Sequence, residues 1–201
     1  MATESDSNAE RESRIVATVI ELAESGGFEA VRLRDVASQA DVALGTLYKH
    51  FRSKEDLLVA ALTQEARDLE DRLQRRPAEG ETPLDRVTSH FAISTRALCR
   101  RPKLARAVLH AVGSEDPELS VKIGAFHQVV SDTVIRALRG DPEVSWETAT
   151  DMEREVCSVL HAVWYSALIG WRSGQHSQQQ VVERVRSAAV FVLRGAELQT
   201  P

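Results

Sequence analysis

Polar side chains suited to nucleic-acid binding gather in the short stretch LGTLYKH. They are a hydroxyl, a phenol, an ammonium and an imidazole, from Thr46, Tyr48, Lys49 and His50. Such groups bond phosphate oxygens and base edges. Gly45 stands among them, although glycine inside a helix costs about 1 kcal/mol relative to alanine. We interpret this glycine as clearance that lets the helix approach DNA closely.

Two short helices joined by a turn are needed to present this stretch. Val36 and Ala37 have the spacing of buried positions on a first helix, and Leu47 and Phe51 lie one turn apart on a second. Asp41 falls in the turn, where an aspartate tolerates left-handed backbone geometry at modest cost. The spacing predicts a helix-turn-helix, although a generic pattern of this kind also fits a solvated helical hairpin that binds nothing.

The local charge favours the DNA interpretation. The chain has a formal net charge of −5, which by itself argues weakly against nucleic acid as a partner. Residues 30–54, however, carry five Arg and Lys side chains against two Asp, a net charge of +3. A basic patch on an otherwise acidic protein steers DNA to that patch.

The remainder of the chain also has helical patterns. Gly26 and Gly27 end a first helix, and Ser53 with Asp56 forms a capping box that begins a long one. Three further helices begin at prolines suited to a first turn, Pro83, Pro102 and Pro117. No segment alternates as a strand would, so the prediction is an all-α protein of about nine helices and no sheet.

The last two predicted helices, roughly 146–172 and 177–195, bear on assembly. The run VCSVLHAVWYSALIGW is apolar on nearly every side, which indicates burial on more than one face. A single large core would explain this. We favour a homodimer in which these two helices pack against a second copy as a four-helix bundle.

Other classes of protein find little support. Cys99 and Cys157 are far apart and predict reduced, buried thiols of a cytoplasmic protein. None of the six histidines lies in a metal-ligand pattern, and no nucleophile elbow or glycine-rich phosphate loop is present. We therefore predict no enzyme activity, no cofactor, no metal site and no membrane partner, because the longest apolar run is interrupted by polar residues.

One motif is specific enough to suggest a family. The stretch GGFEAVRLRDVASQADVALGTLYKHFRSKEDLLVAAL resembles the DNA-binding domain of TetR-family regulators. The resemblance implies a homodimer on a palindromic double-stranded DNA operator and a C-terminal domain that binds a small apolar effector and releases the DNA. It divides the chain into a disordered tail, a helix-turn-helix DNA-binding domain and an effector-binding and dimerisation domain, over residues 1–10, 11–56 and 57–201.

The resemblance also assigns roles to residues. In the recognition helix, about 44–50, Thr46, Lys49 and Leu44 would face bases. Phosphates would be held by Tyr48, His50 and Lys54, with Arg34 of the preceding helix also reaching DNA. Arg32 and Ala43 stand where the family often has Ser or Thr caps, and Asp41 where it often has Gly. A missing cap costs about 1 kcal/mol, so packing is expected to compensate.

The effector is expected among the helices of the C-terminal half. Few charges interrupt the apolar stripes of these helices, which favours a large apolar ligand with one or two polar ends. TPLDRV, RALCRRPKLARAVLHAV and VWYSALIGW resemble the KstR-like branch of the family, which regulates steroid catabolism, and this implies a steroid or acyl-CoA type of effector. Polar groups that could face the ligand are His127, His161, Ser94 and Tyr165. The apolar candidates are Phe91, Leu98, Leu104, Val108, Phe126, Val130, Trp164 and Leu168.

Two alternatives stay open at this point. The protein could activate transcription, since the outcome depends on where the operator lies relative to the promoter. It could also be a helical carrier of apolar ligands that binds no DNA. A repressor that an effector releases from its operator is the function we favour.

Overall fold

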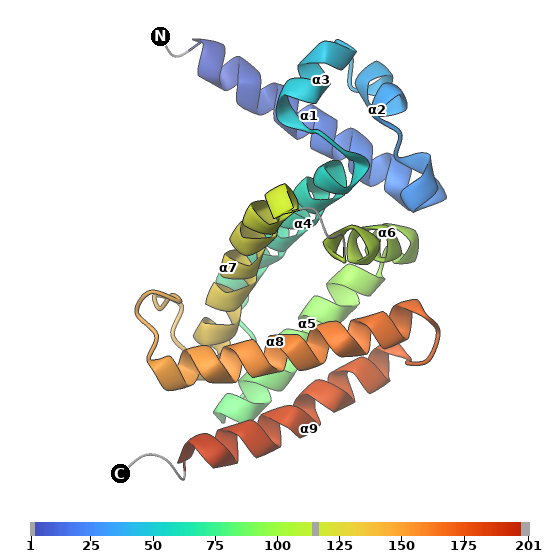
Figure 1. Ribbon diagram of the computed structural model, residues 1–201. Coiled ribbons are helices and arrows are strands. Elements are labelled where there is room, and N and C mark those ends of the chain that lie inside the picture. The colour runs from blue at the N-terminus through green and yellow to red at the C-terminus, as the bar shows by residue number, and fades with distance from the viewer. Residues whose placement is uncertain (1–2, 114–116, 198–201) are drawn as a thin grey trace. The chain divides into compact units, whose positions relative to one another are not determined.

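The computed structural model describes residues 3–113 and 117–197, and within them the chain forms nine α-helices and one short 3-10 helix, with no strand (Figure 1). The all-α prediction is therefore confirmed. The helices are α1 Thr3–Gly26, η1 Phe28–Ala30, α2 Leu33–Gln39, α3 Leu44–His50, α4 Lys54–Arg75, α5 Pro83–Cys99, α6 Pro102–Val112, α7 Pro117–Arg139, α8 Asp151–Arg172 and α9 Gln178–Glu197.

The chain divides into two compact units, which do not follow the predicted boundary at residue 56. Unit 1 comprises residues 1–65 and 101–126, and unit 2 comprises residues 66–100 and 127–201. Helix α6 and the first part of α7 thus belong to the same unit as the helix-turn-helix. The assignment of DNA binding and effector binding to separate parts of the chain stays a prediction.

In unit 1, the helix-turn-helix is shaped by residues that end helices and form turns. Helix α1 ends before Gly27, whose φ of 69° is the left-handed conformation that glycine adopts without strain. Asp41 has a φ of 53° in the turn between α2 and α3, as the sequence predicted. Leu47 and Phe51 are buried together with Val36, so α3 is fastened by one face and presents the other.

Helix α6 packs against α1 and η1 within unit 1. The rings of His110 and Phe28 lie 4.2 Å apart, and the Lys103 ammonium donates to the carbonyl of Ser25 over 2.6 Å. Arg101, just before α6, pairs with Glu65 at 3.0 Å. These contacts join segments far apart in sequence, which explains why periodicity alone did not place α6 here.

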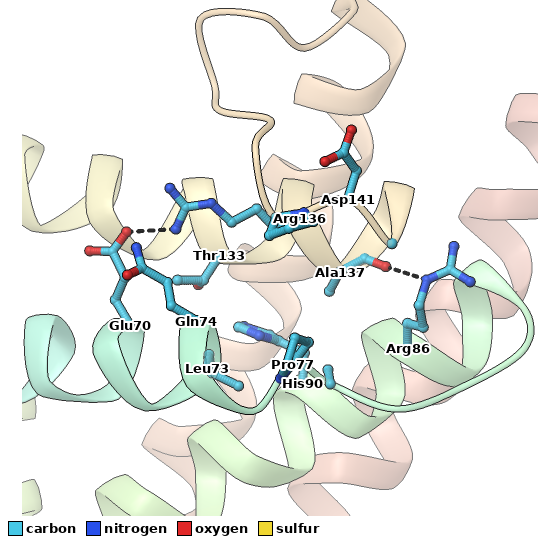
Figure 2. Close-up of a pocket in the computed structure, with 13 residues that line it drawn as sticks. Glu70, Leu73, Gln74, Pro77, Arg86, His90, Thr133, Arg136, Ala137 and Asp141 are labelled. Carbon is cyan, nitrogen blue, oxygen red and sulfur yellow. Dashed lines mark hydrogen bonds and ion pairs between the residues drawn. The ribbon is translucent and has the colours of Figure 1, made fainter.

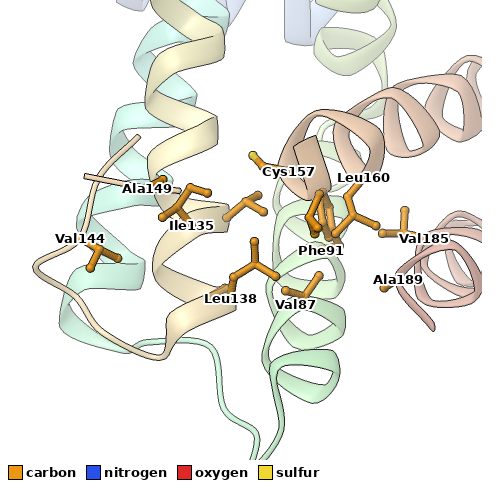
Figure 3. Close-up of a cluster of buried hydrophobic side chains, with 13 residues drawn as sticks. Val87, Phe91, Ile135, Leu138, Val144, Ala149, Cys157, Leu160, Val185 and Ala189 are labelled. Atoms are coloured by element: carbon orange, nitrogen blue, oxygen red, sulfur yellow. The ribbon is translucent and has the colours of Figure 1, made fainter. Parts of the chain in front are cut away.

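Unit 2 is held by a core shared among α5, α7, α8 and α9 (Figure 3). Phe91, Leu160 and Val185 are completely buried in it, and α9 packs against both α5 and α8. In Figure 1, α8 and α9 run side by side as a helical hairpin. Burying this much apolar surface is the main stabilising contribution to such a bundle.

Two predicted boundaries differ from the structure. Helix α1 begins at Thr3, inside the segment 1–10 assigned to a disordered tail, because good helix formers such as Ala9 and Glu10 precede the apolar stripe; residues 1 and 2 lie outside the described residues. Helix α8 begins at Asp151, not near Trp146, because Thr150 and Glu153 form a capping box there.

In the part of the chain that the structure describes, no helix is long and apolar enough to cross a membrane.

Candidate functional site

The exposed face of α3 carries the polar groups that the sequence singled out. Lys49 is exposed, and Tyr48 keeps 52% of its surface accessible. Leu44, Thr46 and His50 are half-buried at the edges of this face. The face therefore offers an ammonium, a phenol, a hydroxyl and an imidazole within two helical turns.

Gly45 lies at the exposed start of α3. A Cβ atom added at this position would meet no heavy atom within 4 Å. Its backbone is not in the left-handed region, so neither conformation nor packing within the described residues requires glycine here. Clearance for a close approach by DNA, as interpreted from the sequence, stays a prediction.

Arg34 and Lys54, the two predicted DNA contacts outside α3, differ in their surroundings. Arg34 is exposed on α2. The Lys54 ammonium lies 4.2 Å from the centre of the Phe28 ring and 3.5 Å from the Glu29 carboxylate. Lys54 therefore reaches a phosphate only by leaving these two contacts, and its role in DNA binding stays a prediction.

The two helices of the helix-turn-helix lack side-chain caps, whereas α4 begins with a capped turn and an ion pair. Neither Arg32 nor Ala43 makes a side-chain cap hydrogen bond, as expected from their types. At the start of α4 the Ser53 hydroxyl accepts the Asp56 N–H at 3.1 Å, while the Asp56 carboxylate accepts the N–H of Arg52 and not that of Ser53. The same carboxylate pairs with Lys122 of α7, whose ammonium lies 5.4 Å from the Phe51 ring.

Unit 2 contains a pocket of about 120 Å³ between the end of α4, α5 and the second part of α7 (Figure 2). Its apolar surface comes from Leu73, Pro77 and Ala137, and the buried ring of His90 reaches it from α5. Ligand pockets for drug-sized molecules are about 300–1,000 Å³. This pocket alone can hold only a small group or the end of a larger molecule.

The two arginines that line this pocket are occupied by the fold. Arg136 pairs with Glu70 at 2.7 Å. Arg86 donates to the carbonyls of Ala137 and Leu138, each at 2.9 Å, where α7 ends and its carbonyls lack helical partners. Both guanidinium groups are therefore already engaged and do not offer a ready partner for a ligand phosphate or carboxylate. The pocket is suited to an apolar group.

The eight apolar residues predicted to contact the effector are divided between the two units. Leu104 and Val108 are buried on α6 in unit 1, and Phe126 is half-buried at the end of that unit's part of α7. The others belong to unit 2, where Phe91 and Leu168 are buried and Leu98, Val130 and Trp164 are half-buried. None of the eight lines the pocket of Figure 2, and their role stays a prediction.

Two histidine rings contact Phe91 in unit 2, those of the buried His90 and the half-buried His161. The His90 ring meets that of Phe91 edge-on at 5.2 Å, and the His161 ring does so at 6.0 Å. Burial lowers the pKa of His90 to about 3, with a smaller contribution from His161. Burial likewise lowers the pKa of His161 to about 4, with a smaller contribution from His127. Both imidazoles are therefore neutral at pH 7.

His161 is among the residues predicted from the sequence, whereas the pocket residues Glu70, Arg136 and His90 are not. Glu70 and Arg136 are separated by 66 residues, and nothing in a single sequence pairs them. A single histidine on an apolar helical face, such as His90, gives no indication in the sequence that it lines a pocket.

Helices α8 and α9 leave apolar side chains uncovered. On α8, Val159 is 41% exposed and Tyr165 is 37% exposed, and on α9 Phe191 is 74% exposed. A shallow hollow lies between the two helices, lined by residues such as Ala162 and Gln180. The role of these side chains in dimerisation stays a prediction.

Comparison with known proteins gives the class. Residues 15–61 match the family of bacterial regulatory proteins named tetR, and residues 80–192 match the tetracyclin repressor-like C-terminal domain. The chain therefore belongs to the TetR family, and it is a DNA-binding transcriptional regulator and not an enzyme.

Named relatives narrow the comparison. The HTH-type transcriptional repressor KstR of Mycolicibacterium smegmatis is 33% identical over 196 residues, covering 97% of this chain and 92% of that protein. KstR of Mycobacterium tuberculosis is 32% identical over 190 residues, 94% of this chain and 83% of that protein.

Solved structures share the fold. A TetR transcriptional regulator from Rhodococcus sp. RHA1 matches with a TM-score of 0.83 at 24% identity, covering 93% of this chain and 97% of the other. The repressor FadR of Thermus thermophilus, in complex with lauroyl-CoA, matches with a TM-score of 0.70 at 18% identity, covering 92% and 94%.

Proposed function

We propose that this protein is a repressor that binds a palindromic operator as a homodimer and is released by a large apolar effector of the steroid or acyl-CoA type. The observation that carries the DNA-binding part is the face of α3, where exposed polar side chains surround a glycine that no described part of the chain requires. The KstR relatives, named as repressors, support the regulatory outcome. We place this activity in the cytoplasm, where an operator is accessible.

On the operator, α3 enters the major groove. Lys49, Thr46 and Leu44 face base edges, while Tyr48 and His50 bond flanking phosphates. Arg34 reaches the DNA backbone from α2. Lys54 also binds a DNA phosphate, once its ammonium has left the carboxylate of Glu29. Gly45 removes the side chain that would hold the helix away from the DNA.

Dimerisation uses α8 and α9. Val159, Tyr165 and Phe191 form an apolar surface that a second copy covers in a four-helix bundle. An isologous interface of this kind gives the dimer two-fold symmetry, and each helix-turn-helix then meets one half of a palindrome.

The effector is an apolar molecule bound by the buried face of the C-terminal half. The resemblance to KstR-like regulators of steroid catabolism implies a steroid type of effector, and FadR in the solved complex holds lauroyl-CoA. The pocket of Figure 2 is suited to an apolar end of such a ligand because its lining is mostly apolar and its arginines are engaged. Candidates are steroid acids, their coenzyme A thioesters and fatty acyl thioesters.

Operator binding is tested first, with the DNA that flanks the gene. Lys49→Ala and Tyr48→Phe should each weaken binding by about tenfold in gel shifts, and Lys49→Ala should also relax the discrimination between bases at the position it contacts. Arg76→Ala is the matched control, because Arg76 is an exposed cation at the end of α4, far along the chain from α3. If Lys49→Ala binds the operator as the unaltered protein does, the assignment of this face is wrong.

Release is tested separately by thermal-shift screening of steroid acids and acyl thioesters, followed by gel shifts with every compound that stabilises the protein. Stabilising compounds should dissociate the operator complex. If another chemical class stabilises the protein and releases DNA while these do not, the effector assignment is wrong. A protein without any salt-dependent DNA binding would be a carrier.

A further inference from the structure

One buried nitrogen in unit 2 has no hydrogen-bond partner within the described residues. It is Nε2 of His161 on α8. The other ring nitrogen, Nδ1, lies 3.6 Å from the thiol of Cys157, one turn earlier on the same helix. Buried polar atoms in native proteins nearly always have a partner, and each exception calls for an explanation such as a bound water or ligand. A partner that is not part of the chain explains this one.

The surroundings of this nitrogen are aromatic and otherwise satisfied. The Phe91 ring stands between His161 and Trp164, with ring centres 6.0 Å and 5.6 Å away from it. The Trp164 indole N–H donates to the Thr95 hydroxyl over 2.9 Å, and the Ser94 hydroxyl donates to the carbonyl of His90 over 2.9 Å. The buried Nε2 of His161 is therefore available to bond a polar group that enters this part of unit 2.

The charge state of the nearby histidines limits which chemical group can bond Nε2 of His161. At neutral pH the two buried histidines are uncharged, since burial lowers the pKa of each. An uncharged imidazole gives no counter-charge to a carboxylate or phosphate, and burying such an anion without one is strongly unfavourable. The atom that meets Nε2 is therefore a neutral oxygen.

The tautomer decides between two neutral oxygens. Burial raises the pKa of the Cys157 thiol to about 11, so the thiol keeps its proton. If S–H donates to Nδ1, then Nε2 carries the imidazole proton and donates to a ketone or a hydroxyl. If instead S–H donates to the carbonyl of Ser131, 3.9 Å away, then Nδ1–H points to the sulfur and Nε2 accepts from a hydroxyl. A hydroxyl fits both cases and a ketone fits one.

We propose that His161 is the polar anchor of the effector site, and that its Nε2 binds a neutral hydroxyl or ketone oxygen carried on an otherwise apolar ligand. This rests on the proposed function, since it takes unit 2 to hold the effector. It adds that the buried part of the ligand bears one oxygen, and that a pure hydrocarbon end is bound less well.

The first test needs no ligand. His161→Phe keeps an aromatic ring of similar size and removes the unpaired nitrogen, so the ligand-free protein should melt at the same temperature as the unaltered protein or higher. A purely structural histidine would give the opposite sign. A lower melting temperature for His161→Phe therefore overturns the proposal. His161→Gln is the second variant, because its amide restores a hydrogen-bonding group.

The second test measures binding of matched probes delivered in cyclodextrin. One series is cholestane, cholestanone and cholestanol, and the other is hexadecane and hexadecanol. In at least one series the unaltered protein should bind an oxygen-bearing member about tenfold more tightly than the hydrocarbon. His161→Phe should bind all members of that series alike, and His161→Gln should regain part of the preference.

Three results contradict the anchor: no preference in the unaltered protein, the same preference in His161→Phe, or no binding in either series. Operator release is scored separately by gel shift with the unaltered protein. If the preference depends on His161 but no probe that binds releases the operator, the anchor stands and the proposed release mechanism fails.

Discussion

At the scale of single residues, Gly45 destabilises its own helix, and we propose that it does so to let DNA approach closely. It lowers the stability of α3 by about 1 kcal/mol relative to alanine, and a side chain at this position would meet nothing within 4 Å. A larger residue should thus be tolerated by the fold and rejected by the DNA.

Gly45→Leu should therefore fold and dimerise normally, melt at an equal or higher temperature, and lose operator affinity by about tenfold or more. Gel shifts with thermal unfolding check both halves of this prediction. Gly124→Leu is the matched control, since Gly124 lies in α7 and also has open space at its Cβ position. Retained affinity in Gly45→Leu would mean that the clearance argument is mistaken.

Glu153 makes a pH-dependent contribution at the start of α8. Its two carboxylate oxygens accept from Arg139 at 2.6 Å and 2.8 Å, and Thr150 N–H donates to one of them. The hydrogen bond from Arg139 is the main reason that the pKa of Glu153 falls from 4.5 to about 2. A lowered carboxyl pKa stabilises the fold above the ordinary pKa, and this stabilisation is lost as pH falls through the folded value.

Glu153→Gln should cost about 1–2 kcal/mol at pH 7, after allowance for partial exposure. The difference from the unaltered protein should shrink as the pH falls from 4.5 to about 2. Urea unfolding at a series of pH values measures this difference. Glu79→Gln is the control, because Glu79 lies in an exposed pair and should show no such trend. A constant difference across the range would contradict the assignment.

At the scale of elements, Asp56 joins three parts of unit 1. Its carboxylate accepts the N–H of Arg52, which follows α3, and pairs with the ammonium of Lys122 on α7. Its own N–H donates to the Ser53 hydroxyl. Removing a buried carboxylate leaves these donors without their partner, which costs more than the pair itself contributes.

Asp56→Ala should destabilise the protein by about 2 kcal/mol and lower Tm by about 4–8 °C. Asp56→Asn should do so less, because its amide oxygen still accepts the backbone N–H. Lys122→Met tests the ion pair alone and should cost under about 1 kcal/mol, since the Lys122 side chain is 44% exposed. Equal effects of Asp56→Ala and Lys122→Met would show that the backbone acceptor role is unimportant.

Helix ends were predictable where a local signal stood beside them and not where two signals competed. Asp41, Gly27 and Ser53 adopt the roles that their types indicated. The start of α8 was misplaced because the apolar Trp146 extended the pattern, whereas the capping box of Thr150 and Glu153 begins the helix later. The Trp146 N–H donates instead to the Asp132 carboxylate over 2.6 Å.

At the scale of the whole molecule, the proposed dimer would cover the exposed apolar side chains of α8 and α9. Phe191 is 74% exposed on α9, where burial against a partner would contribute about 1.5–3 kcal/mol for such a side chain. A charge placed at the centre of an apolar interface disrupts it without disturbing the monomer's own core.

Phe191→Asp should therefore give a folded monomer in sedimentation experiments and should weaken operator binding, because one half-site alone holds less well. Val121→Asp is the matched control, since Val121 is 78% exposed on α7, outside the proposed surface. A dimer that persists in Phe191→Asp and dissociates in Val121→Asp would move the interface away from α9.

The sequence by itself determined the helical fold, the turn at Asp41, the buried side of α3 and the family, because caps, periodicity and glycine positions act within a few residues of each other. Only the tertiary structure decided that α6 joins unit 1, that Asp56 meets Lys122 from 66 residues away, and that His161 keeps a buried nitrogen without a partner in the described chain. Such pairings follow from how helices pack, and many partners at that separation satisfy the same local pattern equally well.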